Sequence, residues 1–472
     1  MTKLDFLCLL PLLVVASAPI IMMLTITIAR NFKVVYVFSL LMFVAAIASL
    51  FFTVPYIPYR IEPLLILDGF SILFLGTVFG VSFLITIISY LYLKNHTGER
   101  EEYFIILFIA TLGASVLVMA NHFVTFFLGL ETLSISLYVL IAYLKYRDYS
   151  IEAGVKFLVI ASVATAFLLF GMALIYAATG EMSFAGVAAA FEEGGLSPVL
   201  LAGFAMMLTG IGFKLALVPF HMWTPDIYQG APAPVSTFIA TVSKGAILAV
   251  FIRFFTQIDG SQNSVLIVLI SVVAILSMFT GNLIALKQSN FKRLLAYSSI
   301  AHMGYLMITL LTGTVYGVQA AIFYLISYMV TTLGTFGTIS ILSVCERDAE
   351  DIDDLKGLFW KNPRIAVVLS LCLLSLAGIP LTAGFIAKFD LVLEGVRAGF
   401  WILAFSLVIN SVISLFYYLR VIKTMFTKSD SERYFGLPPA GGIVLAIVLI
   451  GILFLGILPT YLTEFINSFL SL

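Results

Sequence analysis

The sequence predicts an all-α protein that crosses a membrane many times, and three observations indicate this class. Of the 472 residues, 62% are hydrophobic and only 11% are charged. The mean hydropathy is +1.13, far above that of a soluble globular protein. The apolar residues fall into stretches of about 20, the length that a helix needs to cross a bilayer. The net charge of +0 gives no reason to expect a nucleic-acid partner.

About fourteen stretches are long enough to span the membrane. Short polar or basic segments separate them, so each stretch is one predicted helix. In chain order the predicted helices cover residues 4–28, 34–54, 70–93, 104–120, 123–143, 153–178, 199–221, 236–257, 264–286, 294–312, 316–344, 364–394, 400–426 and 441–468. The first stretch continues past Pro19 to Ile28, which is longer than the apolar region of a signal peptide. We expect residues 1–472 to form a single transmembrane domain.

The basic residues predict how these helices are oriented. Most Lys and Arg residues lie in loops after odd-numbered helices, for example Lys145, Arg293 and Lys356, whereas the opposite loops hold few, such as Arg60 and Arg397. Cytoplasmic loops carry the excess of basic residues. We therefore expect both termini to lie outside, with the seventh helix running inward and the twelfth running outward.

Helix breakers interrupt the seventh and twelfth helices at membrane depth. Pro219 lies in the seventh helix, and Gly378, Pro380 and Gly384 lie in the twelfth. A break in a membrane helix frees backbone groups that only protein or trapped water can satisfy. Proline and glycine are also common in ordinary transmembrane helices. Their matched positions, each close to a lysine, favour a functional interpretation.

The spacing of the two breaks predicts an inverted repeat. An interval of five helices reverses the orientation, so helices 4–8 and helices 9–13 would form two inverted five-helix repeats with a broken helix at the fourth position of each. The chain then divides into helices 1–3 (residues 1–100), a first repeat (101–258), a second repeat (259–430) and a C-terminal helix (431–472). Transport sites are built in this way.

Charged residues inside the apolar helices are the strongest candidates for function. Lys214, Lys244 and Lys388 lie within predicted helices, and so does the carboxylate of Glu131. Each costs at least about 2.5 kcal/mol at the centre of a bilayer. Ion pairs that only join helices are the alternative, and Lys388 lies near enough to the outer face to extend its amine to the surface. We favour a route for protons or small cations.

Two histidines are weaker candidates. His302 lies within the tenth helix and could relay protons near neutral pH, although a hydrogen-bonded core histidine is an equal alternative. His221 and Asp226 follow the seventh helix on the cytoplasmic side and could mark a proton entrance, with an ordinary loop hydrogen bond as the alternative. The four histidines are too dispersed for two haem-ligand pairs.

Other motifs exclude several classes of site. The sequence has no Walker A, dinucleotide or zinc motif and no nucleophile elbow, so the energy for transport must come from elsewhere. The acidic stretch 346–354 is expected to form a solvated surface helix, or to bind a neighbouring subunit.

Five segments resemble one membrane-protein family. Residues 127–134, 214–234, 241–244, 282–305 and 375–389 are similar to the subunit N family, one of the antiporter-like membrane subunits of respiratory complex I, the NADH-quinone oxidoreductase. The resemblance covers most of the chain after about residue 60. It implies a fourteen-helix antiporter-like fold with the inverted repeat. It also implies a bacterial inner membrane and redox-driven proton translocation.

The same resemblance implies roles for the charged residues. Glu131 and Lys214 would interact as a pair, Lys244 would be the central relay and Lys388 the outer proton site. The chain would bind no cofactor itself, because NADH, FMN, the iron–sulfur clusters and the quinone would lie in partner subunits. Its partners would be other membrane subunits of complex I, including antiporter-like neighbours and small membrane subunits, within the lipid bilayer.

Two alternatives stay open. A subunit of a multi-subunit sodium/proton antiporter or of a membrane-bound hydrogenase would share the fold and the charged residues. In a purely structural role, the buried charges would only hold helices together, and lysine variants would then assemble poorly.

Overall fold

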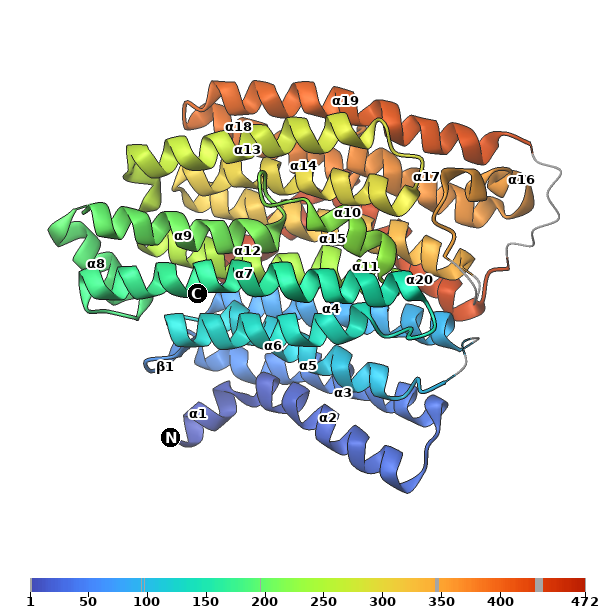
Figure 1. Ribbon diagram of the computed structural model, residues 1–472, viewed down its shortest axis with the longest axis horizontal. Helices are drawn as coiled ribbons and strands as arrows, with labels where there is room; N and C mark the ends of the chain where they lie inside the picture. Colours follow the sequence, from blue (N-terminus) through green and yellow to red (C-terminus); the bar gives the residue numbers. More distant parts are fainter. Residues whose placement is uncertain are drawn as a thin grey trace.

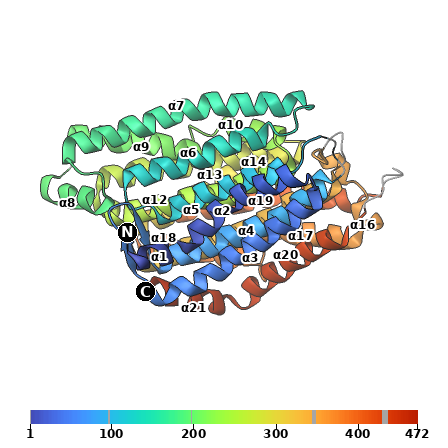
Figure 2. The same cartoon turned by 90° about the horizontal axis from the view of Figure 1, so that it is seen from below.

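The computed structural model describes residues 2–94, 96, 98–195, 197–343, 348–428 and 436–471. Helices make up most of this part of the chain and lie side by side in one bundle (Figures 1 and 2). Within the described residues, 13 helices are long and apolar enough to cross a membrane. The prediction of an all-α polytopic membrane protein is confirmed.

The N-terminal part contains a short hairpin that the sequence analysis does not predict. Its elements are α1 (Lys3–Cys8), α2 (Leu10–Ile28), α3 (Phe32–Thr53), β1 (Tyr59–Ile61), β2 (Leu65–Leu67) and α4 (Gly69–Leu93), with a 3₁₀ turn at Val54–Tyr56. The strands are antiparallel, with Arg60 opposite Ile66. Asp68 begins α4 by accepting a hydrogen bond from the backbone N–H of Ser71 at 2.8 Å. The same carboxylate binds Arg253 at 2.7 Å, which joins this part of the chain to α12 (Lys244–Gln257).

The middle and C-terminal parts contain the remaining helices. These are α5 (Glu102–Met119), α6 (Phe123–Ile141), α7 (Asp148–Thr179), α8 (Phe184–Gly194), α9 (Pro198–Leu215), α10 (Trp223–Gly230), α11 (Ala233–Phe238), α12 (Lys244–Gln257), α13 (Ser264–Ala285), α14 (Phe291–Thr312), α15 (Val315–Leu342), α16 (Leu358–Lys361), α17 (Pro363–Ala377), α18 (Ala383–Arg397), α19 (Trp401–Phe426), α20 (Pro439–Ile457) and α21 (Pro459–Leu470). Ile239–Ser243 form a π-helical turn, and Gly260–Gln262 and Ile352–Leu355 form 3₁₀ turns. The last predicted helix is therefore two helices.

Two neighbouring helix pairs pack through glycines. A Cβ atom on Gly113 of α5 would lie 2.5 Å from the backbone nitrogen of Leu133 on α6. A Cβ atom on Gly281 of α13 would lie 2.7 Å from the backbone nitrogen of Ala301 on α14. Small residues let membrane helices approach this closely. These pairs are the first two helices of each predicted repeat, but α7 and α9 approach equally closely at Gly171, so this packing does not distinguish the repeat, which stays a prediction.

The two breaks differ in detail from the sequence prediction. Helix α9 ends at Leu215, Ala216 has a φ of 63°, and Pro219 lies in the connection to α10. Helix α17 ends before Gly378, and Pro380 lies in the connection to α18. The placement of Gly384 in the break is wrong, because this residue belongs to the first turn of α18.

The two ends of the bundle are distinct. Helices α1, α8 and α21 lie at one end, and α16 lies at the other (Figures 1 and 2). The spans Ala233–Gln257 and Phe291–Thr312 are buried throughout their most apolar stretches. These central spans contain Lys244 and His302, so both residues lie at the centre of the protein rather than at its lipid-facing surface.

Candidate functional site

Lys244 lies at the start of α12, directly after the π-helical turn. Such turns are often found at functional sites. The side chain is fully buried, and its Nζ donates to the Ser299 hydroxyl at 2.7 Å. The same hydroxyl accepts from the Tyr328 hydroxyl at 2.8 Å. The ring of Tyr228 lies 5.7 Å from Nζ. Lys244 is therefore held by hydroxyl and aromatic groups of α10, α14 and α15.

His302 lies one helical turn after Ser299 on α14. Its Nδ1 forms a 2.6 Å hydrogen bond with the Tyr324 hydroxyl, and its Nε2 lies 3.5 Å from the Tyr418 hydroxyl. Tyr418 also bonds the hydroxyl of Ser298. A hydroxyl both donates and accepts, so either neutral form of the imidazole can be hydrogen-bonded here. The histidine thus belongs to a continuous buried polar cluster.

Lys388 is bound to the end of the broken helix. Its Nζ donates to the carbonyl of Ala377, the last residue of α17, at 3.0 Å, and it lies 5.4 Å from the ring centre of Tyr305. His302 and Lys388 line the same cavity, whose volume open to the centre of a water molecule is about 10 Å³. That volume is enough for roughly one water molecule. The structure therefore brings His302 and Lys388 to one small cavity.

Glu131 and Lys214 do not touch. The Nζ of Lys214 donates to the Ser134 hydroxyl at 2.6 Å, whereas Glu131 accepts from the Thr165 hydroxyl at 2.9 Å. Within the described residues, no ion pair of 4.0 Å or less joins Glu131 to Lys214. Glu131 and Ser134 both lie on α6, one turn apart. Lys214 therefore contacts α6 one turn away from Glu131. Lys214 is buried and Glu131 is partly exposed.

His221 and Asp226 lie in different surroundings. His221 is 6% exposed, and in the described part of the chain neither of its ring nitrogens has a hydrogen-bond partner. Asp226 lies on α10 and accepts from the Arg293 guanidinium at 2.6 Å, with Lys156 at 4.0 Å. The structure places Asp226 in a surface ion pair and does not join it to His221.

The hydroxyl partners of the charged groups and of His302 were not predicted from the sequence. Ser134 binds Lys214, Ser299 binds Lys244 and Thr165 binds Glu131. Tyr324 and Tyr418 bind His302, and Tyr328 binds Ser299. The sequence spacing could have indicated the two serines, because Ser134 follows Glu131 by three positions and Ser299 precedes His302 by three. Positions three apart share one face of a helix. The tyrosine partners lie on other helices, where no local pattern points to them.

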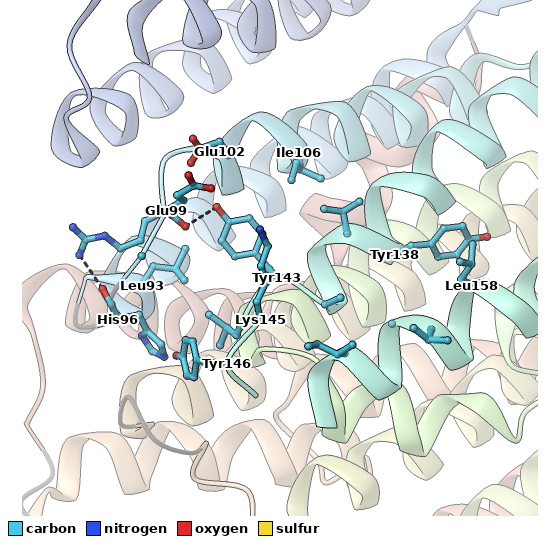
Figure 3. A pocket seen from close by; sticks show the side chains of 18 residues that line it. Leu93, His96, Glu99, Glu102, Ile106, Tyr138, Tyr143, Lys145, Tyr146 and Leu158 are labelled. Atoms are coloured by element: carbon cyan, nitrogen blue, oxygen red, sulfur yellow. Dashed lines mark hydrogen bonds between the residues drawn. The ribbon is translucent and has the colours of Figure 1, made fainter. Parts of the chain in front are cut away.

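A large groove lies away from this polar cluster. It has a volume of about 1030 Å³ and runs from Glu99 and Lys145 at one end to Tyr138 and Leu158 at the other (Figure 3). The Tyr143 hydroxyl donates to the carbonyl of Glu99 across it at 3.0 Å. None of the predicted site residues lines it. Within the described residues, no three His, Cys, Asp or Glu side chains form a group that could hold a metal ion.

Comparisons with known protein sequences give matches over more than half of the chain. A family model described as NADH:quinone oxidoreductase/Mrp antiporter, TM, matches residues 120–414. The NADH-quinone oxidoreductase subunit N of Ectopseudomonas mendocina is 41% identical, over 99% of this chain and 97% of that protein.

Solved structures show the same fold. A chain of respiratory complex I from Thermus thermophilus with bound Aureothin has a TM-score of 0.84 at 31% identity, covering 96% of this chain and 98% of that one. A chain of the Mrp complex from Dietzia has a TM-score of 0.87 at 20% identity, covering 99% and 97%. The second likeness concerns the fold alone.

Proposed function

Because the chain belongs to the NADH:quinone oxidoreductase/Mrp antiporter transmembrane family, we propose that it is the proton-translocating subunit N of a bacterial NADH-quinone oxidoreductase, complex I. It is a multi-pass membrane protein that works with other membrane subunits. It performs no redox chemistry of its own. NADH, FMN, the iron–sulfur clusters and the quinone are bound by partner subunits, whose reaction drives the proton transfer.

One observation supports this proposal above the others: the buried lysines have neutral hydrogen-bond partners. Lys214 and Lys244 each bind a serine hydroxyl, and Lys388 binds a backbone carbonyl. In the described residues, none of the three lies within 4.0 Å of a carboxylate. A serine hydroxyl can accept from an ammonium or donate to a neutral amine, so it suits a lysine that changes its protonation state. Lysines that only joined helices would be expected to have carboxylate partners.

The proposed path runs through the centre of the bundle. A proton on Lys244 passes by way of Ser299 and Tyr328 towards His302, and through the small cavity to Lys388. The first two steps are between hydrogen-bonded groups, and Tyr328, His302 and Lys388 line the one small cavity through which the later steps would pass. Lys388 then releases the proton on the side of the membrane where α18 ends. Moving one proton against about 150 mV costs about 3.5 kcal/mol.

Glu131 and Lys214 control when a proton enters this path. In the structure each binds a hydroxyl, so the pair is open. At about 4 Å and an effective dielectric constant near 20, a closed pair is worth about 4 kcal/mol, which exceeds the cost of moving one proton. A motion of a partner subunit that closes the pair would hold the proton on Lys214, and opening the pair would release it towards Lys244.

The variant K244A tests the proposal. It removes the central amine and leaves a small side chain, so we expect the complex to assemble and to lose most of its proton pumping per NADH oxidised. The measurement uses purified complex in sealed vesicles, with electron transfer and pumping recorded on one preparation. K287A is the matched control, because Lys287 is an exposed lysine. Normal pumping by K244A would overturn the proposal, and failed assembly would favour the structural role.

A further inference from the structure

A buried ion cluster lies at the end of the bundle that bears α16. The Asp348 carboxylate accepts from Lys292 at 2.8 Å, from Arg147 at 3.0 Å and from the Tyr92 hydroxyl at 2.6 Å. The side chains of all three charged residues are 3% exposed or less. The expectation that the stretch 346–354 forms a solvated surface helix is therefore wrong at Asp348, which is buried. Glu346 and Arg347 lie outside the described residues.

Asp348 is charged at neutral pH. Burial alone would raise its pKa, but the charges of Lys292 and Arg147 outweigh burial and hold the pKa of this carboxyl below its usual value. The stabilisation that follows is present at neutral pH and is lost only as the pH falls through that lowered pKa. With two cations and one anion, the cluster has a net charge of +1.

Lys292 also binds the end of α10. Besides Asp348, its Nζ donates to the carbonyl of Gln229 at 2.9 Å and to that of Ala231 at 2.6 Å. The carbonyl between them, that of Gly230, accepts from the Ser150 hydroxyl at 2.7 Å. The last carbonyls of a helix have no partner within the helix. Lys292 and Ser150 supply those partners, so the short helix α10 is held at its C-terminal end.

Helix α10 connects this cluster to the central lysine. Tyr228 precedes the bound carbonyl of Gln229 by one residue, and its buried ring lies 5.7 Å from the Nζ of Lys244. The Tyr228 hydroxyl lies 3.5 Å from the Ser299 hydroxyl that binds the same Nζ. Another side of α10, with Asp226 and Gln229, lines an open cavity of about 310 Å³. A shift of α10 would therefore move both the aromatic neighbour of Lys244 and the barrier between Lys244 and that cavity.

We propose that Lys292, held by Asp348, is a positioning residue for the central proton relay. It fixes α10 so that Tyr228 stays against Lys244 and Ser299. The inference rests on the proposed function, because a position matters here only if Lys244 transfers protons. A buried ion pair often adds little stability compared with apolar residues of similar size. Its more specific effect in this fold is to bind the carbonyls of a helix that has only eight residues.

The test compares variants at the two ends of this connection. K292M removes the donor to α10, and Y228L removes the ring beside Lys244. Each should lower the number of protons pumped per NADH oxidised by about twofold or more, the range of coupling effects transmitted through packed contacts. Both substitutions act through the contact of Tyr228 with Lys244 and Ser299. The double variant K292M/Y228L should therefore pump as many protons per NADH oxidised as Y228L alone. D353N is the matched control, since Asp353 is an exposed carboxylate of the same loop.

A further variant separates position from charge. K292M leaves Asp348 and Arg147 as the charged members of the cluster, whereas D348N/K292M leaves Arg147 as the one charge among these three positions and restores their net charge of +1. The inference expects the pumping defect to persist in D348N/K292M, because the bonds to α10 are still absent. Recovery in that variant, additive losses in K292M/Y228L or normal pumping by K292M would each overturn it.

The two proposals fail in distinguishable ways. Normal pumping by K244A would contradict the proposed function itself. Loss of pumping in K244A together with normal pumping in K292M would contradict only the positioning role. A purely structural role of Lys292 would reduce the amount of assembled complex and leave the protons pumped per NADH unchanged in the complex that does assemble.

Discussion

At the residue scale, the hydroxyl partners are as informative as the lysines. Ser299 accepts from Lys244 and Tyr328 at 2.7 and 2.8 Å, so a single oxygen joins α12, α14 and α15. A buried donor left without an acceptor costs about 1–3 kcal/mol. Without this oxygen, the Lys244 amine and the Tyr328 hydroxyl lose their shared acceptor. Their free energy is then lowered by moving apart to other acceptors. The geometry of the relay therefore depends on a residue that carries no charge.

We expect S299A to reduce pumping per NADH oxidised while the complex still assembles, because the substitution removes one oxygen and little volume. S299T keeps the hydroxyl and should recover part of the pumping. S162A is the control, since the Ser162 side chain is exposed and its hydroxyl donates to the carbonyl of Leu158 in its own helix at 2.7 Å. Equal pumping by S299A and S162A would show that the hydroxyl has no part in proton transfer.

At the element scale, the lysines lie where helices begin, end or break. Lys214 is in the last turn of α9, where a cation interacts favourably with the helix dipole. Lys244 follows the π-helical turn, and Lys388 on α18 donates to the last carbonyl of α17. Interrupted helices expose carbonyls that a buried amine can bind. The breaks thus provide polar partners at membrane depth without a carboxylate.

We expect G378A to impair pumping through Lys388. Gly378 has a φ of 88°, a conformation that costs an L-residue about 1–2 kcal/mol, and an added Cβ atom would lie 2.9 Å from the Cδ of Lys388. Gly399 has a φ of 82°, and a Cβ atom added there would have no neighbour within 4 Å. G399A therefore imposes similar backbone strain without a steric contact. A pumping loss in G378A beyond that in G399A measures the displacement of Lys388. Equal losses would contradict this role for Gly378.

At the scale of the whole molecule, the predicted inverted repeat depends on the orientation of the helices in the membrane. The connection before α8 and the segment before α16 lie at opposite ends of the bundle (Figures 1 and 2). The basic residues predict that the end with α16 is cytoplasmic and that both termini lie outside. Five-helix repeats related by inversion require this alternation of sides.

We expect a cysteine at Lys356 to be labelled from the cytoplasmic side and a cysteine at Glu181 from the outside. Both positions are exposed, and the native residues Cys8 and Cys372 are buried. The measurement uses a membrane-impermeant thiol reagent on intact cells and on inverted vesicles, in a chain whose three native cysteines are replaced. Labelling of both positions from one side would contradict the helix count and the inverted repeat together.

Properties that depend on local composition could be predicted from the sequence alone. The membrane class, the approximate helices and the two breaks follow from apolar length and from the positions of Pro219 and Gly378. The buried charges Lys214 and Lys244 are recognisable because a charge within an apolar stretch is costly wherever the helix packs. Two helix ends were predicted wrongly: Gly384 lies inside α18 and not in the break, and the last predicted helix is two helices. Helix ends depend on contacts beyond the local sequence.

Only the tertiary structure decided which groups meet. Ser134 lies 80 positions from Lys214, and Ser299 lies 55 from Lys244, so each partner was selected by the packing of separate helices. Asp348 lies in an acidic stretch typical of a solvated surface, yet it is buried because Arg147, just before α7, and Lys292, on α14, both bind it. A side chain's burial and partners depend on what the rest of the chain places around it, and no local pattern contains that information.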